Sequence, residues 1–217
     1  MRVLSFVEEE VSENFWLNKL QDAYNQRKIL GLINPTNNAY RLVFGEGDNL
    51  PGLIIDIYAN TAVVQAHSIG MHINRQFIAN ALLKVCEGAV QNVYYKSETT
   101  LPFKAELAFE DGYLIKNTDE SKIALENGLK FVSDWSKGQK TGFFLDQRDN
   151  RSLLEHYSAN KRVLNMFCYT GGFSFYAMRG NAELVHSVDS SSRAIKLTDE
   201  NIALNFSDTS RHESFAE

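Results

Sequence analysis

The spacing of apolar residues in the first part of the chain predicts a compact α+β unit. Residues 12–30 place Phe15, Leu20 and Tyr24 on one face of a helix, which Gly31 ends. Short runs rich in β-branched and aromatic residues follow, and Asn127-Gly128 between two of them is a strong hairpin signal. Strands are expected at 40–44, 53–58, 61–67, 91–96, 112–117, 122–128 and 129–134, with a helix at 74–86.

The pattern changes near residue 137. A helix is predicted at 147–157. A strand at 161–167 then leads into a glycine turn and a helix at 171–180, and a second strand and a second helix follow at 183–189 and 192–206. Strands that alternate with helices in this way form a parallel α/β sheet. We therefore expect an α+β domain over 1–134 and the beginning of an α/β domain over 135–217. Its two predicted strands are too few for a stable doubly wound domain.

The most informative segment is NMFCYTGGFSFYA (165–177), in which a buried strand runs into a Gly-Gly turn and then a helix. Glycines there let the backbone pass close to a ligand at the helix N-terminus. Asp189 ends the next strand, where a carboxylate can accept hydrogen bonds from ribose hydroxyls. We call residues 169–172 the glycine turn. Together with Asp189 it predicts a site for a nucleoside cofactor.

The residues of the glycine turn favour S-adenosylmethionine over a dinucleotide. A dinucleotide site needs G-x-G-x-x-G to hold a pyrophosphate, and the segment CYTGGF (168–173) lacks that spacing. S-adenosylmethionine carries no phosphate, and a looser turn with hydroxyl and backbone donors suits it. A simpler interpretation of Gly171 and Gly172 is a tight strand-to-helix connection. A simpler interpretation of Asp189 is a cap of the following helix, a role compatible with binding ribose.

The composition is that of an ordinary globular protein, with 44% hydrophobic and 23% charged residues, and it excludes disordered and fibrous classes. The sequence contains no apolar run of membrane-spanning length, no signal peptide and no C-x-x-C pair, so a cytoplasmic protein is predicted. A net charge of −5 argues against a protein that coats nucleic acid non-specifically. It leaves room for an enzyme that touches RNA through one local patch.

Positive charge gathers in one stretch and is diluted by acidic residues, which is typical of a solvent-exposed helix face. The residues are Lys137, Lys140, Arg148, Arg151, Lys161 and Arg162. The histidines are scattered without metal-ligand spacing, so no metal is predicted.

Several long segments resemble the family of large-subunit ribosomal RNA methyltransferases that make 5-methylcytosine. They are LENGLKFVSD (125–134), GQKTGFFLDQRDNR (138–151), VLNMFCYTGGFSFYA (163–177) and SVDSSSRAIKLTDENIALN (187–205), and GEGDNLPGLIIDIY (45–58) is similar to the family's central domain. The resemblance covers nearly the whole chain. It implies an α/β protein, in which a small N-terminal α+β domain that faces RNA precedes the start of a Rossmann-like class I methyltransferase domain.

The resemblance also implies that the chain is a fragment. The family carries an N-terminal RNA-binding PUA domain, and RVLSF (2–6) is similar to the segment that follows it. The family's later D-P-P segment and cysteine motif are not found in the sequence. The fragment is therefore expected to bind the cofactor S-adenosyl-L-methionine at most and to show no methyl transfer alone.

Residues expected at the cofactor follow from the motifs that they match. The family motif K-T-G-F-F-L-D-Q-R is matched by Lys140, Thr141, Gly142, Phe144, Gln147 and Arg148. The family's cofactor loop is matched by Tyr169, Thr170, Gly171 and Gly172. Asp189 matches the acid that binds the ribose, and Ser190 is expected on the adenine side. The alternative for Gln147 and Arg148 is helix capping and a surface ion pair with Asp146 or Asp149.

The reaction implied is methyl transfer to carbon 5 of a cytosine in large-subunit ribosomal RNA. A thiolate attacks the ring beside the methylated carbon, and the expected nucleophile lies beyond residue 217. Cys168 is instead expected to be a small packing residue, and Cys86 part of the core. Two alternatives stay open: methylation of guanine N7, which needs no thiol, and a non-catalytic module whose sheet a partner completes. A homodimer is also left open.

Overall fold

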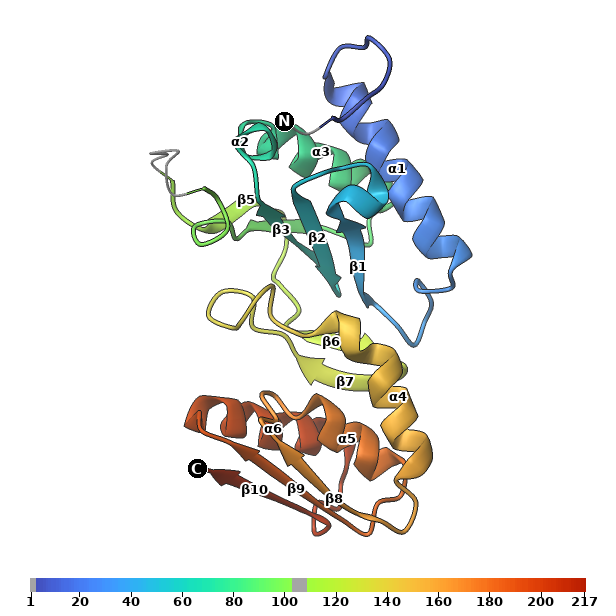
Figure 1. Ribbon diagram of the computed structural model, residues 1–217, viewed down its shortest axis with the longest axis vertical. Coiled ribbons are helices and arrows are strands. Elements are labelled where there is room, and N and C mark those ends of the chain that lie inside the picture. Colours follow the sequence, from blue (N-terminus) through green and yellow to red (C-terminus); the bar gives the residue numbers. More distant parts are fainter. Residues whose placement is uncertain (1–2, 103–108) are drawn as a thin grey trace. The chain divides into compact units, whose positions relative to one another are not determined.

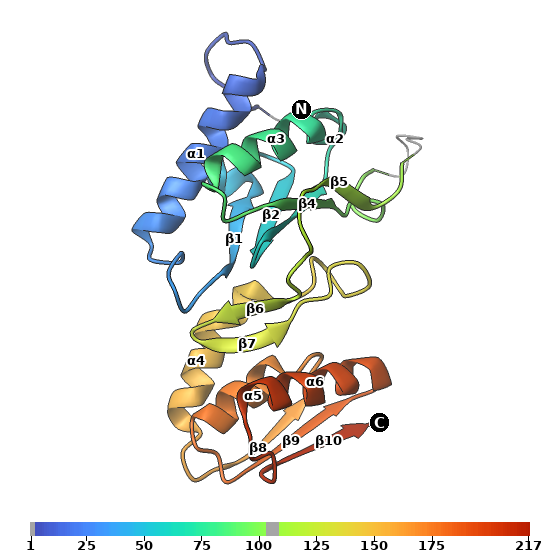
Figure 2. The ribbon, with the colours of Figure 1, turned by 180° about the vertical axis from the view of Figure 1, so that it is seen from behind.

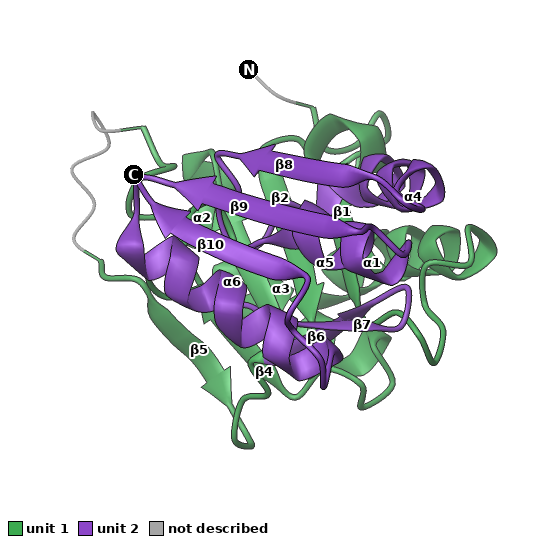
Figure 3. Cartoon of the chain, turned by 90° about the horizontal axis from the view of Figure 1, so that it is seen from below, with its two compact units in different colours: residues 1–122, 134–142 green, residues 123–133, 143–217 purple. Residues whose placement is uncertain are grey.

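The computed structural model describes residues 3–102 and 109–217, so the first residue of the RVLSF segment lies outside the described residues. The chain forms two compact units (Figure 3). The first contains residues 1–122 and 134–142, and the second contains residues 123–133 and 143–217. The chain therefore crosses between the units more than once.

The first unit is built on a five-stranded sheet in the order β1-β2-β3-β4-β5. Its strands are β1 (Ala39–Phe44), β2 (Leu53–Tyr58), β3 (Thr61–Ala66), β4 (Asn92–Tyr95) and β5 (Gly112–Lys116). Strands β3 and β4 are parallel, and the other neighbours are antiparallel. Two longer helices, α1 (Glu13–Ile29) and α3 (Arg75–Val85), pack against each other beside the sheet (Figure 1). The short helices α2 (Ile69–Ile73) and η1 (Gly45–Asp48) complete it.

The hydrophobic core of the first unit lies between these helices and the sheet. Trp16 and Leu20 of α1 and Leu82 of α3 are fully buried against Leu42 and Ile55 of the strands. Burial of such side chains contributes about 1.5–3 kcal/mol each relative to exposure. The helical and alternating apolar patterns of the sequence thus predicted the elements that build this core.

The second unit contains a three-stranded parallel sheet in the order β10-β9-β8. Its strands are β8 (Arg162–Met166), β9 (Leu184–Asp189) and β10 (His212–Ala216). Helices α5 (Gly172–Arg179) and α6 (Ser192–Asn205) lie on one face of this sheet (Figure 2). The unit also contains the β6 (Ile123–Glu126) and β7 (Leu129–Val132) hairpin, η3 (Leu145–Gln147) and α4 (Arg148–Tyr157).

Strand β10 corrects the expectation of two parallel strands. Its segment His212–Ala216 pairs with β9 from Val185 to Asp189. The sequence HESFA has no apolar run, because only one large apolar side chain, Phe215, stands in it. Pairing with the edge of β9 therefore forms this strand without the pattern that identifies strands in sequence.

The predicted tight turn at Asn127-Gly128 is confirmed, and a second tight turn joins β2 to β3. Strands β2 and β3 pair from Leu53↔Ala66 to Tyr58↔Thr61, and Ala59 between them has φ 51°. In the β6–β7 hairpin, Asn127 and Gly128 have φ 50° and 81°, as a type I′ turn requires. Asparagine and glycine adopt this left-handed region at low cost.

The β6–β7 hairpin belongs to the second unit, although the sequence suggested a boundary after residue 134. Asn205 of α6 accepts a hydrogen bond from Lys130 N at 2.8 Å and donates one to Lys130 O at 2.7 Å. This side-chain amide occupies the free edge of β7 much as a neighbouring strand would. Local sequence patterns cannot show such a contact, because it joins residues 75 positions apart.

Candidate functional site: a glycine turn at the ends of two parallel strands

The glycine turn follows β8 and begins helix α5. The backbone is left-handed at every second residue, with φ 57° at Phe167, 52° at Tyr169 and 77° at Gly171. A left-handed backbone costs an L-residue roughly 1–2 kcal/mol, and such strain concentrates at functional sites. Residues 167–171, which lead into the turn, thus have the backbone of an alternating glycine motif, with Phe167 and Tyr169 at two of its three left-handed positions.

Asp189 fixes the turn from the end of β9. Its Oδ2 accepts a hydrogen bond from Tyr169 N, and its Oδ1 accepts one from Ser191 N, both at 2.9 Å. Each carboxylate oxygen has a second lone pair, so both can still accept a hydroxyl. The helix cap of α6 is Ser191, whose Oγ accepts from Ala194 N at 3.3 Å, so the alternative interpretation of Asp189 as the cap is wrong.

Glycine is required inside the turn by close packing as well as by backbone conformation. A Cβ on Gly171 would lie 2.6 Å from Thr198 Cγ2. A Cβ on Gly172 would lie 3.2 Å from Phe143 Cζ and 3.3 Å from Arg151 Cδ. The inner side of the turn is therefore filled by protein.

The turn also offers polar groups suited to a nucleoside with an amino-acid tail. The Thr170 side chain is 2% exposed, and its Oγ1 has no hydrogen-bond partner. Helix α5 begins at Gly172, and the first N–H groups of a helix have no intrahelical acceptor. A buried hydroxyl, unpaired helix N–H groups and the Asp189 carboxylate fit a cofactor that carries a carboxylate and ribose hydroxyls.

Ser190, Phe144 and Gln147 have different surroundings. Ser190 is exposed after Asp189. The Phe144 ring meets the Tyr169 ring edge-on, with the centroids 5.3 Å apart. Gln147 donates to Asp146 Oδ2 at 3.1 Å and accepts from Asn150 Nδ2 at 2.9 Å. It stands at the N-cap position of α4, but its side chain makes no capping hydrogen bond.

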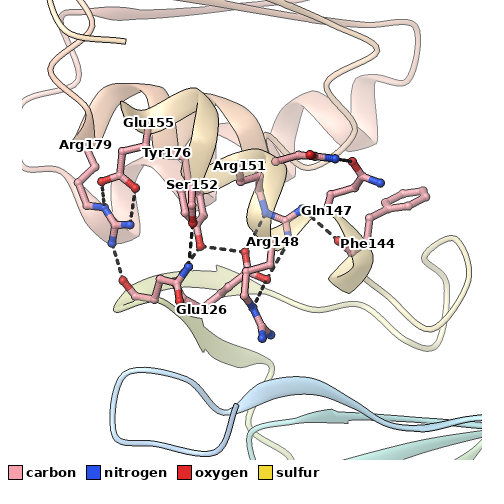
Figure 4. Close-up of polar contacts among 11 residues, drawn as sticks. Glu126, Phe144, Gln147, Arg148, Arg151, Ser152, Glu155, Tyr176 and Arg179 are labelled. Carbon is pink, nitrogen blue, oxygen red and sulfur yellow. Dashed lines mark hydrogen bonds and ion pairs between the residues drawn. The ribbon is translucent and has the colours of Figure 1, made fainter. Parts of the chain in front are cut away.

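Arg148 and Arg151 both bind a buried carboxylate, that of Glu126 (Figure 4). Glu126 is fully buried and accepts from Arg151 Nε and Nη2, both at 2.8 Å, and from Arg148 Nε at 3.3 Å. The hydroxyl of Tyr176 donates to Glu126 Oε1 at 2.9 Å. Burial, and then the charge of Glu126, raise the pKa of Tyr176. Arg148 thus pairs with Glu126, a partner that the sequence did not predict.

The prediction of a solvent-exposed basic face is therefore wrong for Arg148 and Arg151. The Arg151 side chain is 2% exposed and that of Arg148 is 13% exposed. Arg151 also donates from Nη1 to Phe144 O at 3.0 Å. The charge of Glu126 lies 22 or more positions away in the sequence, so the run of basic residues gave no sign of this pairing.

Lys140, Thr141 and Gly142 belong to the first unit, whereas Phe144 onward belongs to the second. Thr141 is fully buried and donates from Oγ1 to Asp56 Oδ2 at 2.5 Å. Tyr58 OH therefore donates to Thr141 Oγ1, at 2.9 Å. Arg41 neutralises Asp56 through Nε and Nη2, at 2.8 and 2.9 Å. The hydroxyl proton of Thr141 is thus committed inside the first unit, while Lys140 is exposed with φ 48°.

Both cysteines are buried. Burial raises the pKa of the Cys86 thiol to about 12 and also raises that of Cys168, which is 6% exposed. A thiol needs its thiolate form to attack a ring. Their assignment as packing residues agrees with this environment.

Among residues 3–102 and 109–217, no three His, Cys, Asp or Glu side chains gather closely enough to hold a metal ion. None of the helices in these ranges combines the length and the apolar character that crossing a membrane requires.

A parallel sheet with a glycine turn after one strand and an acid at the end of the next defines a nucleoside-binding Rossmann-like fold. Residues 106–216 match the family described as S-adenosylmethionine-dependent methyltransferase, and the chain belongs to that family. S-adenosylmethionine is accordingly its cofactor.

The similar proteins carry related names. The ribosomal RNA large subunit methyltransferase I of Tolumonas auensis is 38% identical over 208 residues, which are 94% of this chain and 52% of the relative. A Streptococcus mutans protein assigned as a SAM-dependent methyltransferase is 26% identical, with a TM-score of 0.83 over 98% of this chain and 54% of its own. A methyltransferase structure complexed with SAH has the same identity and TM-score and covers 98% and 53%. The chain spans about half the length of these proteins.

Sequence reasoning missed three residues that support the turn: Glu126, Thr198 and Asn201. All three are fully buried polar residues. A polar residue on the apolar face of a predicted helix is the signal that could have found the last two, since burial demands a hydrogen-bond partner. Glu126, next to a hairpin turn, carried no such signal.

Proposed function

We propose that this chain binds S-adenosylmethionine at the glycine turn and belongs to an enzyme that methylates carbon 5 of a cytosine in large-subunit ribosomal RNA. The observation that carries the cofactor site is the Asp189 carboxylate, which accepts Tyr169 N and keeps a lone pair on each oxygen for the ribose hydroxyls. In this site the bound cofactor supplies an electrophilic methyl group.

The residues of the turn have separate roles in the proposed site. Thr170 Oγ1 and the N–H groups of the first turn of α5 bind the amino-acid end of the cofactor. Gly171 and Gly172 keep the backbone close to it, and Tyr169 and Ser190 border the nucleoside. Phe144, Gln147 and Arg148 line the approach from η3 and α4. We also propose Lys140, Thr141 and Gly142 as cofactor residues by their motif, although the Thr141 hydroxyl is held by Asp56.

The ribosomal RNA substrate is supported by relatives such as that from Tolumonas auensis, whose name states large-subunit ribosomal RNA methylation. The cytosine product rests on the resemblance of the sequence motifs to the 5-methylcytosine family. A base inside a helix must be unstacked before its ring carbon can be attacked.

This chain alone is expected to transfer no methyl group to cytosine. The reaction needs a thiolate nucleophile, and the pKa values of both Cys86 and Cys168 are raised by burial. Incubation of the purified chain with radiolabelled S-adenosylmethionine and large-subunit ribosomal RNA should label no RNA. Turnover by the chain would overturn this expectation.

Isothermal titration calorimetry with S-adenosylhomocysteine tests the cofactor site. The wild-type chain should bind, and Asp189→Asn should weaken binding about tenfold or more, because a hydrogen bond to a charged group contributes about 1.5–3 kcal/mol. Asp208→Asn is the matched control, since Asp208 is exposed and accepts from Ser210 N two residues away. Equal affinities for the two variants, or a folded wild-type chain that does not bind, would contradict the proposal.

A partner-completed sheet is the second candidate because one observation favours it. Leu164 and Met166 of β8 are 62% and 51% exposed, and Phe215 of β10 is 36% exposed. The register Met166↔Val188↔Phe215 places them on one face of the sheet. Contiguous exposed apolar side chains mark association surfaces. Light scattering across a concentration series tests this candidate and the homodimer together, and a strict monomer would count against both.

A further inference from the structure

We infer that Asn201 is a positioning residue for the cofactor, because it fixes the backbone of the glycine turn against the β6–β7 hairpin. The inference rests on the proposed cofactor site. Asn201 is fully buried in the middle of α6, and both ends of its amide are used. Its Nδ2 donates to Thr170 O at 2.8 Å, and its Oδ1 accepts from Val132 N at 2.7 Å.

The orientation of this amide is determined by its partners. A carbonyl oxygen only accepts and a backbone N–H only donates, so a flipped Asn201 would lose both bonds and bury unpaired groups. Asn201 therefore holds the turn and the hairpin in one relative position within the second unit. At neutral pH no other side chain type of this size offers a donor and an acceptor in the same plane.

Asn201 acts together with two other side chains that hold consecutive peptide groups of the turn. Thr198 lies one helical turn earlier on the same face of α6, and its hydroxyl shares its proton between Tyr169 O and Ala194 O, each 3.0 Å from Oγ1. Asp189 accepts from Tyr169 N at 2.9 Å. The N–H of Tyr169 and the carbonyls of Tyr169 and Thr170 are thus all fixed by side chains.

These bonds determine which way the turn's donors face. In a trans peptide the C=O and the following N–H point in opposite directions, and the described chain has no cis bond. Because α6 holds the carbonyl of Tyr169, the N–H of Thr170 points away from α6. Loss of the Asn201 contact would let the next peptide rotate, and the Gly171 N–H would lose its 2.9 Å bond to Cys168 O.

Asn205 provides a matched control on the same helix. Its amide also bonds the hairpin, through Lys130 N and Lys130 O, but it makes no bond to the glycine turn. A variant at Asn205 therefore disturbs the contact between α6 and β7 and the 2.7 Å bond from Asn205 Nδ2 to the carbonyl of Asn201, but no bond to the turn. A variant at Asn201 disturbs that contact and the turn.

Asn201→Asp is the decisive variant, because its effect should reverse with pH. At pH 8 the carboxylate cannot donate to Thr170 O, and we expect affinity for S-adenosylhomocysteine to fall about tenfold or more. Burial raises the pKa of a carboxyl group, and the protonated acid has one O–H donor and one acceptor, as the amide does. Between pH 8 and pH 5 its affinity, relative to wild type at each pH, should recover. Asn205→Asp should stay within about twofold of wild type throughout.

Amide hydrogen exchange of the ligand-free chains at pH 8 tests the positioning itself, whether or not the cofactor binds. Exchange at Gly171 should accelerate in Asn201→Asp and stay unchanged in Asn205→Asp. If Asn201→Asp does not fold at pH 8, Asn201→Ser removes the amide without adding charge and should show the same acceleration.

The outcomes separate this inference from the proposed function. A wild-type chain that does not bind refutes the cofactor site, whereas the exchange result still decides the role of Asn201. Unchanged exchange at Gly171, equal loss of affinity in the Asn201 and Asn205 variants, or no recovery at low pH would overturn the inference.

Discussion

The backbone nitrogen of Tyr169 donates to Asp189 Oδ2 at 2.9 Å and so joins the start of the glycine turn to the end of the neighbouring strand. Strands β8 and β9 are parallel neighbours, so their C-terminal ends meet at one edge of the sheet. The residue proposed to bind the ribose therefore also fixes the turn proposed to bind the rest of the cofactor. Changes to the turn should consequently affect the fold and the cofactor site together.

Gly171→Ala should destabilise the chain. The new Cβ would lie 2.6 Å from Thr198 Cγ2, and φ 77° is unfavourable for alanine. We expect a loss of about 2 kcal/mol or more in the free energy of unfolding, measured by urea denaturation. Adding Thr198→Ser, which removes the Cγ2 atom, should restore part of the loss. Full stability of Gly171→Ala would show that the turn is looser than described.

Glu126→Gln should be among the most destabilising polar substitutions. It leaves the Arg151 guanidinium, whose side chain is 2% exposed, without its carboxylate partner. Breaking a buried ion pair in this way costs about 3–5 kcal/mol. Glu87→Gln is the control, because its pair with Lys28 is exposed at both ends and should leave the urea midpoint unchanged. Similar midpoints for the two variants would refute the importance of the buried cluster.

The chain should lose stability at pH values below 6.5, and part of this loss should come from His212. Burial lowers its pKa, and the charge of His186 acts in the same direction, whereas Asp199 and Glu213 oppose it. The unfolded chain then binds a proton near pH 6.5 that the folded chain takes up only at lower pH. Stability contributed by neutral His212 is therefore present above pH 6.5 and is lost as the pH falls through the lowered folded pKa.

His212→Gln measures this contribution. Glutamine can still donate to Ser187 Oγ, which lies 2.8 Å from His212 Nε2, but it does not titrate. The wild-type free energy of unfolding should decline more steeply than that of the variant between pH 7.5 and pH 5. Parallel pH profiles of the two proteins would exclude His212 as a source of the loss of stability at low pH.

Phe167 should carry backbone strain that its side chain does not offset. It has φ 57°, and its side chain is 86% exposed. Phe167→Ala keeps a Cβ in the left-handed region, whereas Phe167→Gly removes it. The glycine variant should be more stable than the alanine variant by roughly 1 kcal/mol in urea denaturation. A more stable alanine variant would contradict the assigned backbone conformation.

The sequence predicted elements that leave a local pattern. The helices at 12–30 and 192–206 and the turn at Asn127-Gly128 were readable from apolar spacing and turn chemistry, and they lie within one or two residues of α1, α6 and the β6–β7 turn. Strand β10 was missed because its neighbour, rather than its own residues, makes it a strand.

The contacts beneath the site could not be read from the sequence for a related reason. Glu126 meets Arg151 and Asn201 meets Val132 across 25 and 69 positions, and neither segment identifies the distant partner. The glycine motif was only partly visible, because Phe167 and Tyr169 occupy left-handed positions that glycine usually fills.

A crystal structure of the chain with S-adenosylhomocysteine tests the central claim most directly. The account predicts the ligand against Thr170, Gly171 and Gly172, with its ribose hydroxyls within hydrogen-bond distance of the Asp189 carboxylate. Ligand bound elsewhere, or an ordered glycine turn with no ligand at saturating concentration, would contradict it.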